Sequence, residues 1–113
     1  MITFAKIERL ARAFPGAVTS TSYGTPAIKV GKKLILRMHQ KEDAIVMMLA
    51  TVKKQSELIA QDPMAFYITD HYADYAAVLI RPTIEIDRLR VLFESAWRRA
   101  ASKKQLATYQ SNA

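Results

Sequence analysis

The pattern of apolar side chains in the first half of the chain is what most constrains its fold. Residues 27–30 and 33–39 alternate apolar and polar side chains on either side of Gly31-Lys32, which is typical of a β-hairpin. After a polar turn at residues 40–43, residues 44–50 are apolar in both alternating sets, which favours a strand covered on both faces. The sequence therefore predicts three consecutive antiparallel strands.

Segments with helical spacing flank these strands. Apolar side chains recur with a period of about 3.6 residues in three stretches, which predicts helices over residues 4–14, 52–61 and 88–101. The residues expected to cap their N-termini are Thr3, Thr51 and Asp87. A side-chain oxygen at such a position accepts a hydrogen bond from a free N–H group of the first turn.

Two further short strands are predicted over residues 66–68 and 76–81, which gives the order α-β-β-β-α-β-β-α. Strands flanked by helices are typical of the α+β class, here one antiparallel sheet with helices packed on it. The Ser/Thr-rich stretch 17–25 is expected to be a connector. Residues 1–104 are expected to form a single domain, and residues 105–113 a polar, frayed C-terminal tail.

Composition and charge narrow the function classes. The 113 residues include no cysteine, which excludes disulfides, thiolate metal sites and cysteine nucleophiles. No apolar run approaches the roughly 20 residues that span a bilayer, and the first residues lack the apolar stretch of a signal peptide, so we expect a cytoplasmic protein without a membrane partner. The net charge is +7, and residues 1–40 and 81–113 are basic. This balance favours anionic partners, of which nucleic acid is the commonest.

Several short motifs follow one another along nearly the whole chain. They are Phe14-Pro15-Gly16, YGTPAIKVGKKL at residues 23–34, Asp62-Pro63, FYITDHYADY at residues 66–75, VLIR at residues 78–81, and Trp97-Arg98 followed by Lys103-Lys104. In this order and spacing the chain resembles the MmcQ/YjbR-like family.

The resemblance implies a fold of the CyaY-like, double-wing type, and family members are commonly described as DNA-binding proteins. That description rests mostly on fold likeness. The family often has proline before the histidine of the aromatic motif and glycine before the second of the two tyrosines after it, where this chain has Asp70 and Asp74. Both carboxylates add negative charge beside the aromatic side chains and disfavour phosphate contact there.

The candidate nucleic-acid contacts are two groups of basic side chains. They are Lys29, Lys32, Lys33 and Arg37 in the predicted hairpin, and Arg88 and Arg99 on the last predicted helix. In the expected register Lys33, Arg37 and His39 lie on one face, so that the turn acts as a wing presenting lysines to a phosphate backbone. The first hypothesis is a non-enzymatic domain that binds DNA weakly and mainly electrostatically. Charged side chains are equally expected on the solvent face of a half-exposed sheet.

The alternative hypothesis is an interaction module for a protein or a small ligand, using a groove between two loops that the family fold brings together. The candidate groove residues are Tyr23, Gly24, His71, Tyr72 and Tyr75. His71 beside Asp70 and Asp74 also allows a general base or a metal ligand, but this hypothesis is weaker because no second histidine is suitably spaced. We therefore expect no catalytic site, no metal and no cofactor. The sequence leaves the oligomeric state open.

Overall fold

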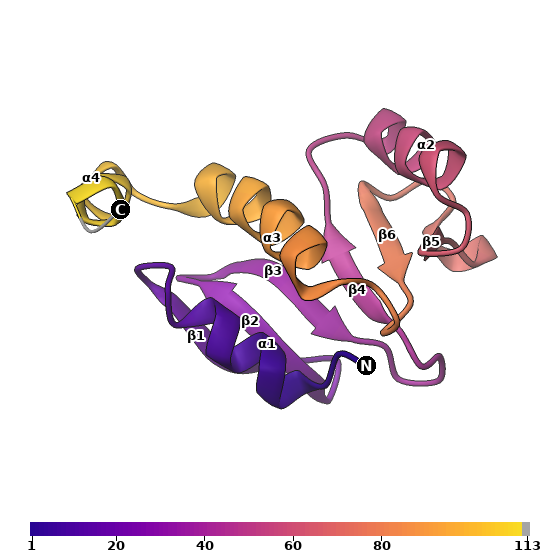
Figure 1. Ribbon diagram of the computed structural model, residues 1–113, viewed down its shortest axis with the longest axis horizontal. Helices are drawn as coiled ribbons and strands as arrows, with labels where there is room; N and C mark the ends of the chain where they lie inside the picture. The colour runs from indigo at the N-terminus through magenta and orange to yellow at the C-terminus, as the bar shows by residue number, and fades with distance from the viewer. Residues whose placement is uncertain (112–113) are drawn as a thin grey trace.

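A six-stranded antiparallel sheet organises the computed structural model, which describes residues 1–111 (Figure 1). The elements are α1 (Phe4–Ala11), β1 (Ala17–Ser22), β2 (Thr25–Val30), β3 (Lys33–Met38), β4 (Ile45–Met48), α2 (Val52–Gln61), β5 (Phe66–Tyr67), the short 3-10 helix η1 (Asp70–Tyr72), β6 (Ala77–Ile80), α3 (Ile86–Ala100) and α4 (Lys103–Ser111). The strand order in the sheet is β1-β2-β3-β4-β6-β5. The predicted α+β class is confirmed.

The sheet has one more strand than the sequence predicts. Residues 17–22, expected as part of a connector, form the edge strand β1, which pairs with β2 from Ala17 opposite Val30 to Ser22 opposite Thr25. The connector prediction is wrong because an edge strand packs weakly, so its Ser and Thr side chains show no apolar alternation.

A β-bulge in β3 changes the expected arrangement of the hairpin. Lys33 pairs with Val30 next to the turn. Farther along, two adjacent residues of β2 pair with two residues of β3 that are not adjacent, and Ile35, which lies between those two, has no partner in β2. Because a bulge reverses the alternation of faces, Lys33 lies on the opposite face of the sheet from Arg37 and His39. The prediction that these three side chains share one face is therefore wrong.

One face of the sheet carries the main hydrophobic core. Figure 1 shows α1 and α3 lying across this face. The core includes Ile7 and Leu10 from α1, Phe93 and Trp97 from α3, and Leu36 from β3. A smaller apolar cluster, formed by Ala44, Val46, Tyr72, Ala77 and Leu79, lies elsewhere in the fold. Within β4, Val46 belongs to this smaller cluster whereas its neighbours Ile45 and Met47 belong to the main core, so the smaller cluster lies on the opposite face. The predicted burial of β4 on both faces is confirmed.

The helix caps agree in part with the sequence. Thr3 and Thr51 accept hydrogen bonds from the backbone N–H groups of Lys6 and Lys54. The last long helix instead begins at Ile86, after the N-cap Glu85. Asp87 was expected to be the cap but lies within the first turn, where a carboxylate interacts favourably with the helix dipole.

The expected frayed C-terminal tail is a helix over its described part. Ser102 and Gln105 form a capping box at the start of α4: each side chain accepts a hydrogen bond from the backbone N–H of the other, at 3.1 and 2.9 Å. Tyr109 then stacks on Phe14 and contacts Trp97, with ring centroids 5.2 and 4.9 Å away. The prediction of a frayed tail is wrong for residues 105–111, and the last two residues of the predicted tail lie outside the described residues.

Candidate functional site

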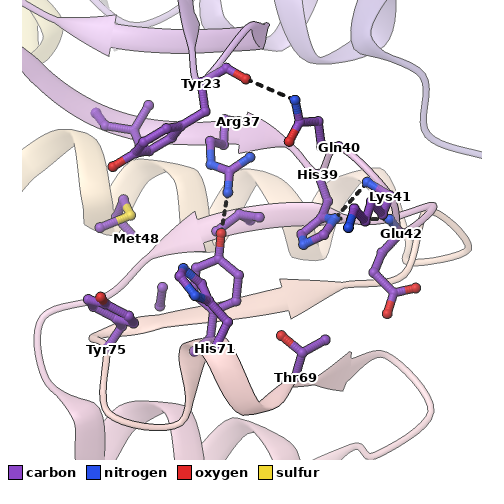
Figure 2. A pocket seen from close by; sticks show the side chains of 14 residues that line it. Tyr23, Arg37, His39, Gln40, Lys41, Glu42, Met48, Thr69, His71 and Tyr75 are labelled. Atoms are coloured by element: carbon purple, nitrogen blue, oxygen red, sulfur yellow. Dashed lines mark hydrogen bonds between the residues drawn. The ribbon is translucent and has the colours of Figure 1, made fainter.

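A pocket of about 730 Å³ lies over the face of the sheet opposite the main core. Figure 2 shows its lining side chains. They come from the β1–β2 turn, from β3 and the turn after it, from β4, from the segment around η1, and from the start of β6. The residues are Tyr23, Leu34, Arg37, His39, Gln40, Lys41, Glu42, Val46, Met48, Thr69, His71, Tyr72, Tyr75 and Ala77. We call this site the aromatic pocket.

Tyr23 is held at the mouth of the pocket by an unusual backbone conformation. Tyr23 and Gly24 form the two-residue turn between β1 and β2, with φ angles of 53° and 76°. Two positive φ angles match the twist of a hairpin, but a tyrosine at the first position is strained. The residue is 80% exposed, and the centroid of its ring lies 5.3 Å from the Arg37 guanidinium carbon. Residues with strained backbone conformations are often found at functional sites.

Arg37 forms the floor of the pocket. The residue is only 8% exposed, and its Nη2 donates a hydrogen bond to the Tyr72 hydroxyl while Nη1 donates to the Met38 carbonyl at 3.2 Å. No carboxylate within residues 1–111 forms an ion pair with Arg37, so its positive charge is not neutralised by a side chain. A buried arginine in this state leaves positive potential in the pocket.

His39 lies beside Arg37 with one fixed ring nitrogen. Its Nδ1 accepts hydrogen bonds from the backbone N–H groups of Lys41 and Glu42, at 3.0 and 2.9 Å. Burial, followed by the positive charge of Arg37, lowers the pKa of His39 from its ordinary value of 6.5, while Glu42 acts in the opposite direction. The neutral ring therefore carries its proton on Nε2.

Three aromatic side chains around η1 form the wall of the pocket across from Tyr23; they are His71, Tyr72 and Tyr75. The His71 ring lies 4.8 Å from Tyr72 and 5.5 Å from Tyr75, centroid to centroid. Gln55, a buried side chain of α2, fixes this segment: its Nε2 donates to the carbonyls of Tyr72, Tyr75 and Ala77 at 2.8, 3.0 and 2.7 Å. Sequence reasoning missed Gln55, although a polar residue on the apolar face of a predicted helix was a usable signal.

The predicted groove residues come together in the structure. Tyr23, His71, Tyr72 and Tyr75 line one pocket, and Gly24 supplies the turn that positions Tyr23. The carboxylates of the aromatic motif do not line it. Residues 1–111 contain no group of three side chains suited to hold a metal ion. His39, Gln40, Lys41, Glu42, Met48 and Thr69 line the pocket although the sequence did not single them out for it.

The predicted basic contacts do not form one surface. Arg37 points into the pocket, Arg88 pairs with Asp62 at 2.8 Å, and Arg99 donates to the carbonyls of Ser95 and Met48. The hairpin lysines differ in exposure. Lys29 is partly buried, whereas Lys32 and Lys33 are exposed at the β2–β3 turn.

Comparisons with protein-family models, with curated proteins and with solved structures give no match to this chain. None of the helices in the described part of the chain has the length and apolar character needed to cross a bilayer. The assignment of a function therefore depends on the geometry of the aromatic pocket and of the basic hairpin.

Proposed function

We propose that this domain is a non-enzymatic binding module that takes a small molecule into the aromatic pocket. The observation that carries the proposal is the convergence of Tyr23, Arg37, His71 and Tyr75 from distant segments onto one concave site. Small-molecule sites in proteins are concave, mostly apolar, of a few hundred cubic ångströms, and contain a few placed polar groups. The pocket volume of about 730 Å³ fits that range.

The rigidity of the pocket supports the same proposal. Gln55 ties down the backbone around η1, and Arg37 joins that segment to β3 through the Tyr72 hydroxyl. Pocket walls that are fixed before a ligand arrives reduce the ordering cost of binding.

A fragment screen by ligand-observed NMR tests this proposal. We expect fragments to bind the wild-type protein and to lose binding in Met48→Trp, because the larger side chain fills the pocket beside Tyr23 and Tyr75. Val91→Trp is the matched control, since Val91 is 67% exposed on α3 and does not line the pocket. Fragments that bind both variants equally, or a screen without any binder, would contradict the proposal.

A second candidate function is weak DNA binding, which the resemblance to the MmcQ/YjbR-like family implies. The observation in its favour is the exposure of Lys32 and Lys33 side by side at the β2–β3 turn. Such a contact would reach phosphates only, with a dissociation constant on the order of 10⁻⁴–10⁻⁶ M that rises steeply with salt. Arg37, Arg88 and Arg99 are engaged within the fold, so the proposal now depends on the hairpin lysines.

Fluorescence anisotropy of a labelled duplex at low and physiological salt tests the DNA proposal. We expect Lys32→Glu/Lys33→Glu to abolish binding. The control is Lys53→Glu/Lys54→Glu, which makes the same charge change at two exposed residues of α2. An equal loss in the two double variants would mean that net charge, and not the hairpin, attracts the DNA.

A further inference from the structure

We infer that the ligand of the aromatic pocket is a planar aromatic acid, with its oxyanion held by Arg37 and His39 and its ring held against Tyr23 and Tyr75. This inference rests on the proposed function and adds the chemical class of the ligand. The pocket joins two kinds of surface, a cationic floor and an aromatic rim. A ligand that complements both needs a negative group at one end and a flat ring at the other.

Arg37, with its unpaired charge and unbonded N–H groups, is the feature of the pocket that most strongly indicates an anionic ligand. A guanidinium has five N–H groups, and within residues 1–111 it donates only the two hydrogen bonds to Met38 and Tyr72. Every fully buried side-chain nitrogen and oxygen in that part of the chain has a partner. The unbonded Nε–H of Arg37 is therefore not fully buried, and a carboxylate or phosphate that reached it could accept hydrogen bonds in the two-pronged geometry that arginine favours.

His39 supplies a second donor beside Arg37. Because its Nδ1 is occupied by two backbone N–H groups, its Nε2–H is the free one. Figure 2 shows the ring nitrogen opposite those bonds directed toward the interior of the pocket. Lys41 adds a positive charge to the lining. Glu42 is the one acidic side chain among the lining residues, and Figure 2 shows its carboxylate directed away from Arg37.

The aromatic rim selects a ring for the other end of the ligand. Tyr23 and Tyr75 are 80% and 55% exposed, which is high for residues of this size. Figure 2 shows the two phenol rings on either side of Met48. Aromatic rings and a thioether make favourable contacts with a flat aromatic group, which would bury the exposed area of both tyrosines.

The charge of the pocket also argues against other ligand classes. A cation would meet the uncompensated charge of Arg37, and a neutral ligand would leave that charge buried without a partner. A purely aliphatic acid would satisfy Arg37 but leave the tyrosine rim exposed. Carboxylate and phosphate are two forms of the same chemistry here, because both accept paired hydrogen bonds from a guanidinium.

Calorimetric titration with a matched series of probes tests the inference. Naphthoate carries ring and charge, naphthamide removes the charge, cyclohexanecarboxylate removes the aromatic ring, and naphthyl phosphate replaces the carboxylate. We expect naphthoate or naphthyl phosphate to bind at least about tenfold more tightly than naphthamide, which corresponds to one charge-assisted pair. We expect cyclohexanecarboxylate to bind more weakly than naphthoate.

Three variants locate the contacts. Arg37→Gln removes the positive charge, so the preference for naphthoate over naphthamide should disappear. Tyr23→Ala should remove the preference for naphthoate over cyclohexanecarboxylate, whereas Tyr23→Phe, which retains the ring, should keep it. Tyr23 is exposed, so these two changes do not threaten the core. The wild-type comparison of probes decides the matter even if Arg37→Gln fails to fold.

The outcomes separate this inference from the proposed function. Equal binding of naphthoate and naphthamide at the aromatic pocket would overturn the aromatic acid and leave a small-molecule module standing. Acid binding that persists unchanged in Met48→Trp would place the acid elsewhere and also overturn the inference. No binding by any probe or fragment would overturn both.

Discussion

The hydroxyl oxygen of Tyr72 accepts a hydrogen bond from the guanidinium of Arg37, 35 residues earlier in the chain. Both residues are buried, and the bond joins η1 to the middle of the sheet. The carbonyl of Tyr72 accepts a second hydrogen bond from Gln55. One residue therefore connects three separate segments around the aromatic pocket.

We expect Tyr72→Phe to lower the free energy of unfolding by about 1–3 kcal/mol, because a buried arginine loses an acceptor that water cannot easily replace. Urea denaturation measures the change. Tyr75→Phe is the control, since Tyr75 is 55% exposed and its hydroxyl makes no hydrogen bond within residues 1–111. Equal stability of Tyr72→Phe and Tyr75→Phe would show that the Arg37–Tyr72 bond contributes nothing net.

Gln55→Ala should be among the more destabilising changes outside the main core. It removes the donor that three carbonyl oxygens share, although those of Tyr72 and Tyr75 keep a backbone N–H partner, and we expect a loss of about 1–3 kcal/mol. Ser56→Ala, at an exposed position of the same helix, should change stability by less than about 0.5 kcal/mol. Hydrogen exchange of residues 72–77 checks the cause, because these amides should exchange faster in Gln55→Ala and not in Ser56→Ala.

Gly16→Ala should destabilise the protein more than Gly31→Ala. Both glycines have positive φ, at 80° and 61°, so each substitution costs about 1–2 kcal/mol of backbone strain. A Cβ at Gly16 would also overlap the side-chain amide of Gln105, whereas a Cβ at Gly31 would meet nothing within 4 Å. Thermal or urea unfolding of the two variants measures the difference.

A double-variant cycle isolates the contact with α4. In a Gln105→Ala background the overlap is absent, so Gly16→Ala should cost no more than Gly31→Ala. If Gly16→Ala costs the same with and without Gln105, the docking of α4 on this turn is not what makes the position sensitive.

Stability should fall in acid because of Glu94. Its carboxylate accepts a hydrogen bond from the Tyr109 hydroxyl and another from Arg98, and these lower the pKa of Glu94 from its ordinary value of 4.5, with Tyr109 the larger cause. A lowered folded-state pKa stabilises the protein above the unfolded-state value, and the stabilisation is lost as the pH falls through the folded-state pKa. The free energy of unfolding should therefore decrease below about pH 4.5.

Tyr109→Phe tests this pH dependence. Removing the hydroxyl should make the acid-side loss of stability smaller, as followed by urea denaturation over a pH series. Arg98→Met, which removes the other partner of Glu94, should reduce the same slope to a lesser degree. An unchanged acid slope in both variants would mean that other carboxylates govern acid unfolding.

The sequence predicts most elements of the fold because their apolar patterns are strong. It fails at β1, where the side chains of an edge strand are too polar to alternate, and the Tyr23-Gly24 turn was the only local signal for a hairpin. It also fails at α4, although Ser102 and Gln105 have the spacing of a capping box. Helix α4 has a weakly apolar face, so its docking depends on Tyr109 finding Phe14 in three dimensions.

The candidate site is predicted in part. The aromatic wall could be anticipated, since Tyr23 and the tyrosines near η1 stand out in the sequence. The floor of the pocket could not be anticipated, because in a regular hairpin Arg37 would be expected to face solvent like the neighbouring lysines. Its true position follows from the extra residue in β3, which is a matter of pairing with β2 and has no local signature.

The bulge at Ile35 has an evolutionary consequence. It divides β3 into an exposed tip that carries Lys33 and an inner half that carries Arg37, on opposite faces of one strand. Substitutions at Lys33 alter surface charge at a residue that does not line the pocket, and substitutions at Arg37 alter the pocket without changing the charge of the turn. The strand thus holds two surfaces that natural selection can modify one at a time.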